Sequence, residues 1–95
     1  MKQPSVYIVA NKRNGTLYTG VTSSLPQRIY QHKNNIIKGF ASKHNCNMLV
    51  YYEVHEEMYS AIMREKQIKA GSRKKKLSLI EEMNPNWSDL YNEIV

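Results

Sequence analysis

The stretch VYIVANKRNGTLYTGVTSS, residues 6–24, decides the fold. Two runs rich in β-branched and aromatic residues, 5–11 and 16–21, lie on either side of Asn14-Gly15. Asn-Gly between two such runs is the strongest short-range signal for a β-hairpin. The stretch therefore predicts two adjoining antiparallel strands, each with a tyrosine, joined by a turn that carries Lys12 and Arg13.

The residues that follow the hairpin predict helices around one further strand. Pro26 suits a first helical turn, Gly71 suits the position just after a helix, and Pro85 ends the helix before it. We therefore predict an α+β domain in ββαβαα order, with a small antiparallel sheet flanked by helices. The predicted elements are a helix over 25–35 with Leu25, Ile29 and Lys33 facing inward, an irregular loop over 36–47, a strand over 48–55, helices over 57–70 and 73–83, and a short last helix containing Trp87, Leu90, Tyr91 and Ile94.

Length and composition limit the possible functions. The 95 residues are enough for a single domain over 1–95, and 14 Lys and Arg against 8 Asp and Glu give a net charge of +6. This surplus favours nucleic acid as partner, with an anionic membrane surface as the weaker candidate. No apolar run is long enough for a membrane span, and neither a signal sequence nor a second cysteine beside Cys46 is present. These features predict a cytoplasmic protein.

The two hairpin tyrosines are expected on one face of the sheet. Side chains alternate along a strand, so Tyr7 and Val9 should share a face with Tyr18 and Gly20. Tyrosines at such positions most often cover a core. A glycine in a strand, however, often marks the close approach of a ligand or of another backbone.

Arg28 and His32 are four residues apart on the first predicted helix and so project from the same face. Such a pair is often simply solvated. Because this helix follows the hairpin directly, its face can reach the tyrosines. The four side chains would then form a cationic, hydroxyl-lined recess, which suits a phosphate.

Glu65 is the most unusual residue of the second long helix. Met58, Ala61, Ile62, Glu65 and Ile68 form one inward stripe, so a carboxylate lies among apolar side chains. An unpaired buried carboxylate is costly, so Glu65 requires either an arginine partner or a cation. Both accounts are open: an ion pair with Arg28 or Arg64, or a hard divalent ion whose other ligands are water and substrate phosphate.

Basic residues cluster at the start of the third long helix, where the helix dipole disfavours positive charge. A phosphate-facing role and a merely solvated face are both compatible with this run. His44, Cys46 and His55 lack the paired spacing of a zinc site. The predicted nucleic-acid-binding residues are Lys12, Arg13, Gly20, Lys69, Arg73, Lys74, Lys75 and Lys76.

With these residues identified, the chain resembles the GIY-YIG nuclease superfamily, and in particular its small freestanding bacterial members, over nearly its whole length. Ser5-Val6-Tyr7 resembles the first triplet of the family and Tyr18-Thr19-Gly20 the second. Arg28 and His32 match the family's helix motif, and Glu65 matches its metal-binding glutamate. The family fold, a three-stranded antiparallel sheet flanked by helices, is also the one predicted above.

The resemblance implies a divalent-metal-dependent endonuclease with low sequence specificity, acting on DNA more than on RNA, with a role in DNA repair or processing. It implies that Glu65 holds one Mg²⁺ or Mn²⁺ ion at the scissile phosphate and that Arg28 stabilises the charge developing on phosphorus. A tyrosine, that of the second triplet, helps to deprotonate the attacking water. Tyr7, Tyr18, Arg28 and His32 are thus the predicted catalytic residues.

The chain also departs from the family pattern. Ser5 replaces a glycine, and Val21 stands where some members have a lysine that assists the base. If that lysine is needed, His32 must substitute for it or the activity will be low. The asparagine that some members carry after the glutamate has only Asn84 as a possible counterpart. The alternative function is a catalytically weak or idle nucleic-acid-binding module of the same fold, and a protein partner is compatible with either.

Overall fold

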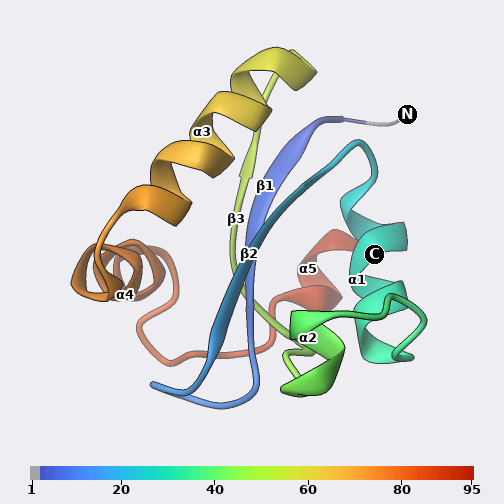
Figure 1. The fold of residues 1–95 in the computed structure, drawn as a ribbon, viewed down its shortest axis with the longest axis vertical. Helices are drawn as coiled ribbons and strands as arrows, with labels where there is room; N and C mark the ends of the chain where they lie inside the picture. Colours follow the sequence, from blue (N-terminus) through green and yellow to red (C-terminus); the bar gives the residue numbers. More distant parts are fainter. Residues whose placement is uncertain (1–2) are drawn as a thin grey trace.

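The computed structural model describes residues 3–95, and its elements follow the order β1, β2, α1, α2, β3, α3, α4, α5 (Figure 1). Within the described residues, no helix is both long enough and apolar enough to cross a membrane. The bounds are β1 Ser5–Ala10, β2 Leu17–Thr22, α1 Leu25–Lys33, α2 Phe40–Lys43, β3 Met48–Val54, α3 Met58–Ala70, α4 Arg73–Met83 and α5 Tyr91–Ile94.

The three strands form one antiparallel sheet in the order β2-β1-β3, which confirms the predicted fold class. The hairpin register pairs Ser5 with Thr22 and Ala10 with Leu17. Asn14 has a φ of 57°, as expected for the turn residue before Gly15. β1 is therefore the central strand, whereas β2 and β3 are both edge strands.

Every residue of β1 is buried, and its side chains contribute alternately to two apolar cores. Val6 and Ile8 face a core that α3 and α4 complete, with Ala61, Ile68 and Ile80 as members. Tyr7 and Val9 face a second core with residues of α1 and the segment before β3. Figure 1 shows the corresponding layers, with α3 and α4 on one side of the sheet and α1, α2 and α5 on the other.

The ends of the long helices follow their local signals. Ser72 caps α4 by accepting a hydrogen bond from the backbone N–H of Lys75, and Gly71 follows the last residue of α3. Helix α1 differs from expectation, because it ends at Lys33 and its third buried residue is His32. The Lys33 side chain instead reaches out to the carboxylate of Asp89 and to the Asn47 carbonyl.

The expectation of an irregular loop over 36–47 is wrong, because this segment contains α2. Gly39 precedes the helix with a φ of 135°, a conformation that residues with a Cβ rarely adopt. Ala41 is buried in the second core, and the backbone N–H of Cys46 donates to its carbonyl at 2.8 Å. Tertiary contacts thus stabilise a helix too short to be recognised from propensity.

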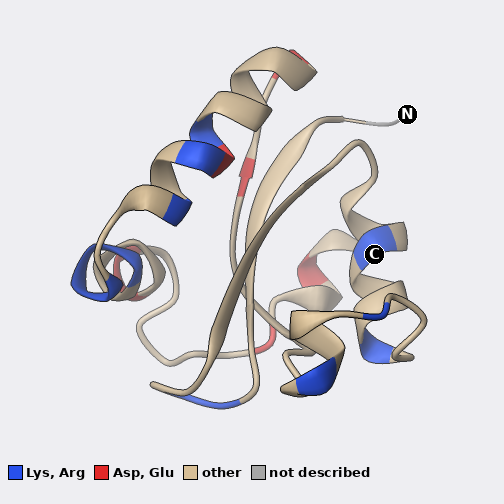
Figure 2. Cartoon of the chain, in the orientation of Figure 1, with Lys and Arg blue, Asp and Glu red and all other residues tan. Residues whose placement is uncertain are grey.

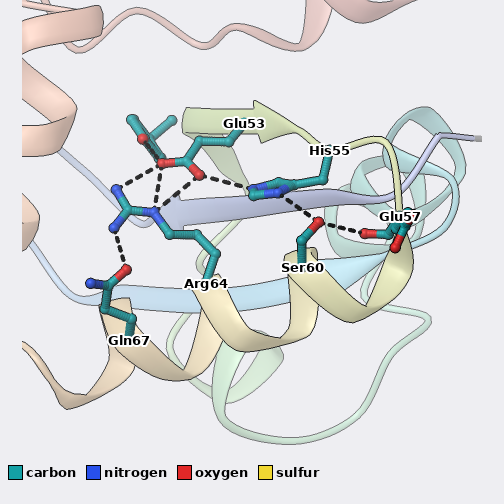
Figure 3. A network of polar contacts seen from close by, with 7 residues as sticks. Glu53, His55, Glu57, Ser60, Arg64 and Gln67 are labelled. Atoms are coloured by element: carbon teal, nitrogen blue, oxygen red, sulfur yellow. Dashed lines mark hydrogen bonds and ion pairs between the residues drawn. The ribbon is translucent and has the colours of Figure 1, made fainter.

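Helix α3 is fixed to the edge strand β3 by a network of polar contacts (Figure 3). The guanidinium of Arg64 donates to both carboxylate oxygens of Glu53, with its Nε 3.1 and 3.0 Å from them. His55 also contacts Glu53, at 3.1 Å, and Tyr51 donates its hydroxyl to the same carboxylate. Burial alone would raise the pKa of Glu53, but the hydrogen bonds from Arg64, Tyr51 and His55 outweigh burial and lower this pKa.

Candidate active site

The structure places the two hairpin tyrosines on one face of the sheet, as predicted. Tyr7 lies opposite Gly20 and Val9 lies opposite Tyr18 in the β1–β2 register. The Tyr7 and Tyr18 rings have centroids 6.5 Å apart. Tyr7 is fully buried, whereas Tyr18 is only partly buried. Of the two hydroxyl-bearing rings, Tyr18 is therefore the more accessible to a substrate.

Helix α1 supplies His32, which is buried against both tyrosines. The Tyr7 hydroxyl and His32 Nε2 are 2.8 Å apart, and the His32 ring centroid lies 5.8 Å from that of Tyr18. Burial and the nearby Arg28 charge both lower the pKa of His32. The imidazole is therefore neutral at pH 7 and can accept a hydrogen bond from the Tyr7 hydroxyl at Nε2.

Burial raises the pKa of Tyr7 to about 12, because the interaction with Arg28 lowers it only in part. Glu65 adds to the increase through its negative charge. The Tyr7 phenol thus keeps its proton at neutral pH, and when the His32 ring carries its proton on Nδ1 the phenol donates a hydrogen bond to Nε2. Arg28 and Glu65 are both near enough for their charges to affect the Tyr7 hydroxyl.

Gly20 is required by the position of the Tyr7 ring. A Cβ at residue 20 would lie 2.4 Å from the Tyr7 hydroxyl oxygen and 2.5 Å from Cζ. The Tyr7 ring cannot move aside easily, because it is fully buried and hydrogen-bonded to His32. The close approach at this glycine therefore comes from a side chain of the protein itself, and no nucleic-acid contact is needed to explain it.

Glu65 reaches the site from α3, which lies on the other side of the sheet. This is possible because β2 is an edge strand and α3 contacts it, so a side chain of α3 can extend around the open side of β2. Figure 1 shows the backbone of α3 on the side of the sheet opposite to α1. Lys69, one turn after Glu65, pairs with it at 2.9 Å and places its Nζ 5.6 Å from the centroid of the Tyr18 ring. The site thus combines residues from both layers of helices.

Of the two accounts left open for Glu65, the ion pair with Arg28 or Arg64 does not appear among the described residues. Arg64 binds Glu53 instead, and the partner of Glu65 is Lys69, whose side chain is 48% exposed. The Glu65 side chain itself is only 13% exposed. A single sheltered carboxylate with an exposed, displaceable partner fits a Mg²⁺-like ion that takes its other ligands from water and phosphate.

Glu65 has no cluster of further metal-binding side chains around it in the described part of the chain. The described residues contain no group of three or more His, Cys, Asp or Glu side chains placed to hold an ion. Asn84 is buried and satisfied by backbone groups, because its amide donates to the carbonyls of Val50 and Ser88 and accepts from the Ser88 N–H. Its role is thus to hold the chain after α4 against β3.

Some of the predicted nucleic-acid-binding residues are bound within the protein, and others have exposed side chains. Arg73 donates to the carbonyls of Asn14 and Gly15 at 2.8 and 2.7 Å, and so fixes α4 to the hairpin turn. Lys74 and Lys75 are exposed and make no such contact through their side chains in the described structure. Figure 2 shows Lys and Arg on the helices on both sides of β2 and at the hairpin turn. Lys12 and Arg13 are exposed in the hairpin turn. Lys69 lies at the candidate site, and Lys76 donates to the Lys69 carbonyl.

Two features of the site were missed by reasoning from sequence. The i, i+4 spacing of Glu65 and Lys69 was a visible signal for their ion pair. Phe40 of α2 lies beside Tyr18, with ring centroids 6.4 Å apart and planes inclined by 25°. No local pattern predicted this contact, because it depends on the unrecognised helix.

The buried Tyr7 should make stability sensitive to alkaline pH. An unfolded tyrosine ionises near pH 10, whereas Tyr7 has a folded pKa of about 12. Its contribution is therefore complete below pH 10 and is lost as the pH rises toward 12, by about 1.4 kcal/mol at pH 11. Urea unfolding at pH 9 and pH 11 should show a smaller decline in Tyr7→Phe than in the wild type. Equal declines in the two proteins would contradict the burial of this hydroxyl.

The comparisons with known proteins agree with the geometry. The model of the GIY-YIG catalytic domain matches residues 3–78. A UPF0213 protein of Staphylococcus saprophyticus is 38% identical over 82 residues, which cover 86% of this chain and 99% of that protein. A UPF0213 protein of Desulfotalea psychrophila is 36% identical over 88 residues, covering 90% and 78%.

One solved structure has a similar fold. The solution NMR structure of the UPF0213 protein of Bacillus halodurans has a TM-score of 0.57 with this chain and covers 92% of each chain. The two sequences are 24% identical. This similarity supports the arrangement of sheet and helices described above.

Proposed function

Since the chain belongs to the GIY-YIG nuclease family, we propose that it is an endonuclease that hydrolyses phosphodiester bonds with the help of one Mg²⁺ or Mn²⁺ ion. The observation that supports this proposal is the contact of Tyr7 with Tyr18 and His32 on one face of the sheet. Lys69 pairs with Glu65 and lies over the Tyr18 ring, and Arg28 lies close enough to affect the Tyr7 hydroxyl. We propose DNA rather than RNA as the main substrate, with little sequence specificity and a role in DNA repair or processing.

The two tyrosines have different roles in this proposal. Tyr7 keeps its proton at neutral pH, so it serves as a hydrogen-bond donor and orients the His32 ring. The partly exposed Tyr18 would first release its own proton to solvent and then, as a phenolate, accept a proton from the attacking water. The ammonium of Lys69 lies over the Tyr18 ring, where its positive charge can assist this proton transfer. Lys69 thereby supplies, from α3, the lysine that is missing at Val21.

In this proposal the negative charge of the substrate is neutralised by residues of α1 and α3. Arg28 can stabilise the negative charge that develops on phosphorus, because its side chain is a guanidinium cation. Glu65 would hold the divalent ion, which when bound polarises the scissile phosphate and stabilises the leaving oxygen. Lys69 would then leave Glu65 and remain available to Tyr18 or to a phosphate.

A cleavage assay tests this function directly. Purified protein is incubated with Mg²⁺ or Mn²⁺ and with single-stranded, duplex, flap and branched DNA, and with the corresponding RNA. We expect metal-dependent cleavage that EDTA abolishes. Binding without cleavage of any substrate would instead favour the alternative function, an idle nucleic-acid-binding module.

Nucleic-acid binding should be mainly electrostatic, and its salt dependence should respond to α4. The variant Lys74→Gln/Lys75→Gln leaves Arg73 at the hairpin turn and removes two exposed charges. For each phosphate of duplex DNA that the variant no longer neutralises, the slope of log affinity against log salt should become shallower by about 0.9. Fluorescence anisotropy over a salt series measures this slope. The variant Lys74→Arg/Lys75→Arg retains the charges and should keep it, and an unchanged slope in the glutamine variant would place these lysines outside the binding surface.

A further inference from the structure

Phe40 is an aromatic side chain that remains half-exposed beside the candidate active site. Its exposed fraction is 51%, and it is a member of neither apolar core. The Phe40 ring has the His44 ring close by, with centroids 4.3 Å apart, and the Tyr18 ring farther away, with centroids 6.4 Å apart, while half of the Phe40 side chain stays exposed. The aromatic contacts thus continue from His32 through Tyr18 to Phe40 and His44, from the recess toward solvent.

The position of the Phe40 ring is fixed by the fold. Helix α2 begins directly after Gly39, and its Ala41 is buried in the second core. The thiol of Cys46 approaches the Thr16 carbonyl at 3.6 Å, which ties the end of this segment to the start of β2. Several large apolar side chains of this protein are exposed, and Phe40 differs from the others in lying beside Tyr18 and His44 at the candidate site.

The surroundings of Phe40 suit a flat ligand that carries negative charge. Lys69 lies over the ring of Tyr18, the neighbour of Phe40, and Lys43 is a further cation on α2 itself. Nucleobases stack on aromatic side chains while cations bind the adjoining phosphates. Inside a duplex, both faces of a base are already stacked on neighbouring bases, so only an unpaired base can use such a surface.

We propose that Phe40 and His44 form a stacking platform for an unpaired nucleobase next to the scissile phosphate. The substrate class is then single-stranded nucleic acid, or a junction with an unpaired nucleotide at the cleavage position. This inference rests on the proposed function, because it takes the recess beside Tyr18 as the phosphate site. Phe40 would determine which strands are bound productively, and the reaction itself would remain with the residues of the recess.

Equilibrium binding without divalent metal tests the platform separately from cleavage. One ligand is a single-stranded oligonucleotide that contains 2-aminopurine. The other is a duplex closed at both ends by loops of abasic linkers, so that it has no unpaired base. Phe40→Leu keeps an apolar side chain against Tyr18 but removes the aromatic face, Phe40→Tyr restores that face, and Tyr59→Leu is the control on an exposed ring of α3. Thermal melts verify that all three variants fold.

We expect Phe40→Leu to weaken single-strand binding by about 5- to 100-fold, to reduce the quenching of 2-aminopurine, and to leave duplex binding within about twofold. Phe40→Tyr should retain wild-type affinity, and Tyr59→Leu should change the affinity for neither ligand. Equal losses for both ligands, or no loss for either, would overturn the platform. The two proposals can fail separately. If the wild-type protein cleaves no substrate but Phe40→Leu still weakens single-strand binding, only the endonuclease proposal is wrong. If the protein cleaves but Phe40→Leu has no effect on binding, only the platform is wrong.

Discussion

Glu65→Gln should reduce cleavage by at least about 100-fold while nucleic-acid binding without metal is kept. The amide has the same shape as the carboxylate but cannot replace it as a ligand for a hard divalent ion. Stability should change little, because the ion pair that this variant removes joins Glu65 to a half-exposed lysine and such i, i+4 pairs contribute about 0.3 to 0.5 kcal/mol.

The matched control is Glu82→Gln, which changes an exposed glutamate on α4. This variant should cleave like the wild type. Cleavage rates and thermal melts with and without Mg²⁺ separate a metal ligand from a structural residue. If Glu65→Gln lowered the melting temperature strongly and independently of metal but cleaved normally, Glu65 would be structural.

Gly20→Ala should have the second large effect, through Tyr7. The added Cβ would overlap the Tyr7 hydroxyl, so the ring must move away from His32 or the β1–β2 hairpin must distort. Overpacking of this kind destabilises a buried site by about 1 to 3 kcal/mol. Because the ring belongs to the proposed catalytic recess, cleavage should fall together with stability.

Gly71→Ala provides the control for a glycine in the same protein. Residue 71 has a φ of −75°, and an added Cβ would meet nothing nearer than the Ile68 carbonyl at 3.3 Å. Its effect on urea unfolding and on cleavage should be small. If Gly20→Ala behaved like Gly71→Ala in both measurements, the close packing of Tyr7 over residue 20 would be incorrect.

The elements that could be predicted from sequence are those whose signals are local. Asn14-Gly15 indicated the hairpin, and Ser72 indicated the start of α4 because its hydroxyl caps the helix. Helix α2 could not be predicted, since four residues after Gly39 are held by contacts with distant parts of the chain. The end of α1 was predicted two residues late: the helix stops at Lys33, and Asn35 after it is left-handed, with a φ of 53°, while the Ile36 N–H donates to the Gln31 carbonyl.

The same distinction applies to the candidate site. The alternation of side chains and the i, i+4 rule correctly brought Tyr7, Tyr18 and His32 together, because both depend only on periodicity. The partner of Glu65 was not correctly predicted, since sequence cannot show that Arg64 is bound by Glu53 of β3. The catalytic and metal-binding roles of these residues stay predictions until the cleavage assays are done.

The contact between Arg64 and Glu53 has a consequence for the neighbouring residue. Consecutive residues of a helix point about 100° apart around its axis. When Arg64 is held by β3, the rotation of α3 about that axis is fixed, and with it the direction in which Glu65 extends around β2. The direction of the Glu65 side chain thus depends on a contact at β3, the edge strand farthest from β2. A substitution of Glu53 would therefore turn Glu65 away from the proposed site although no residue of that site is changed.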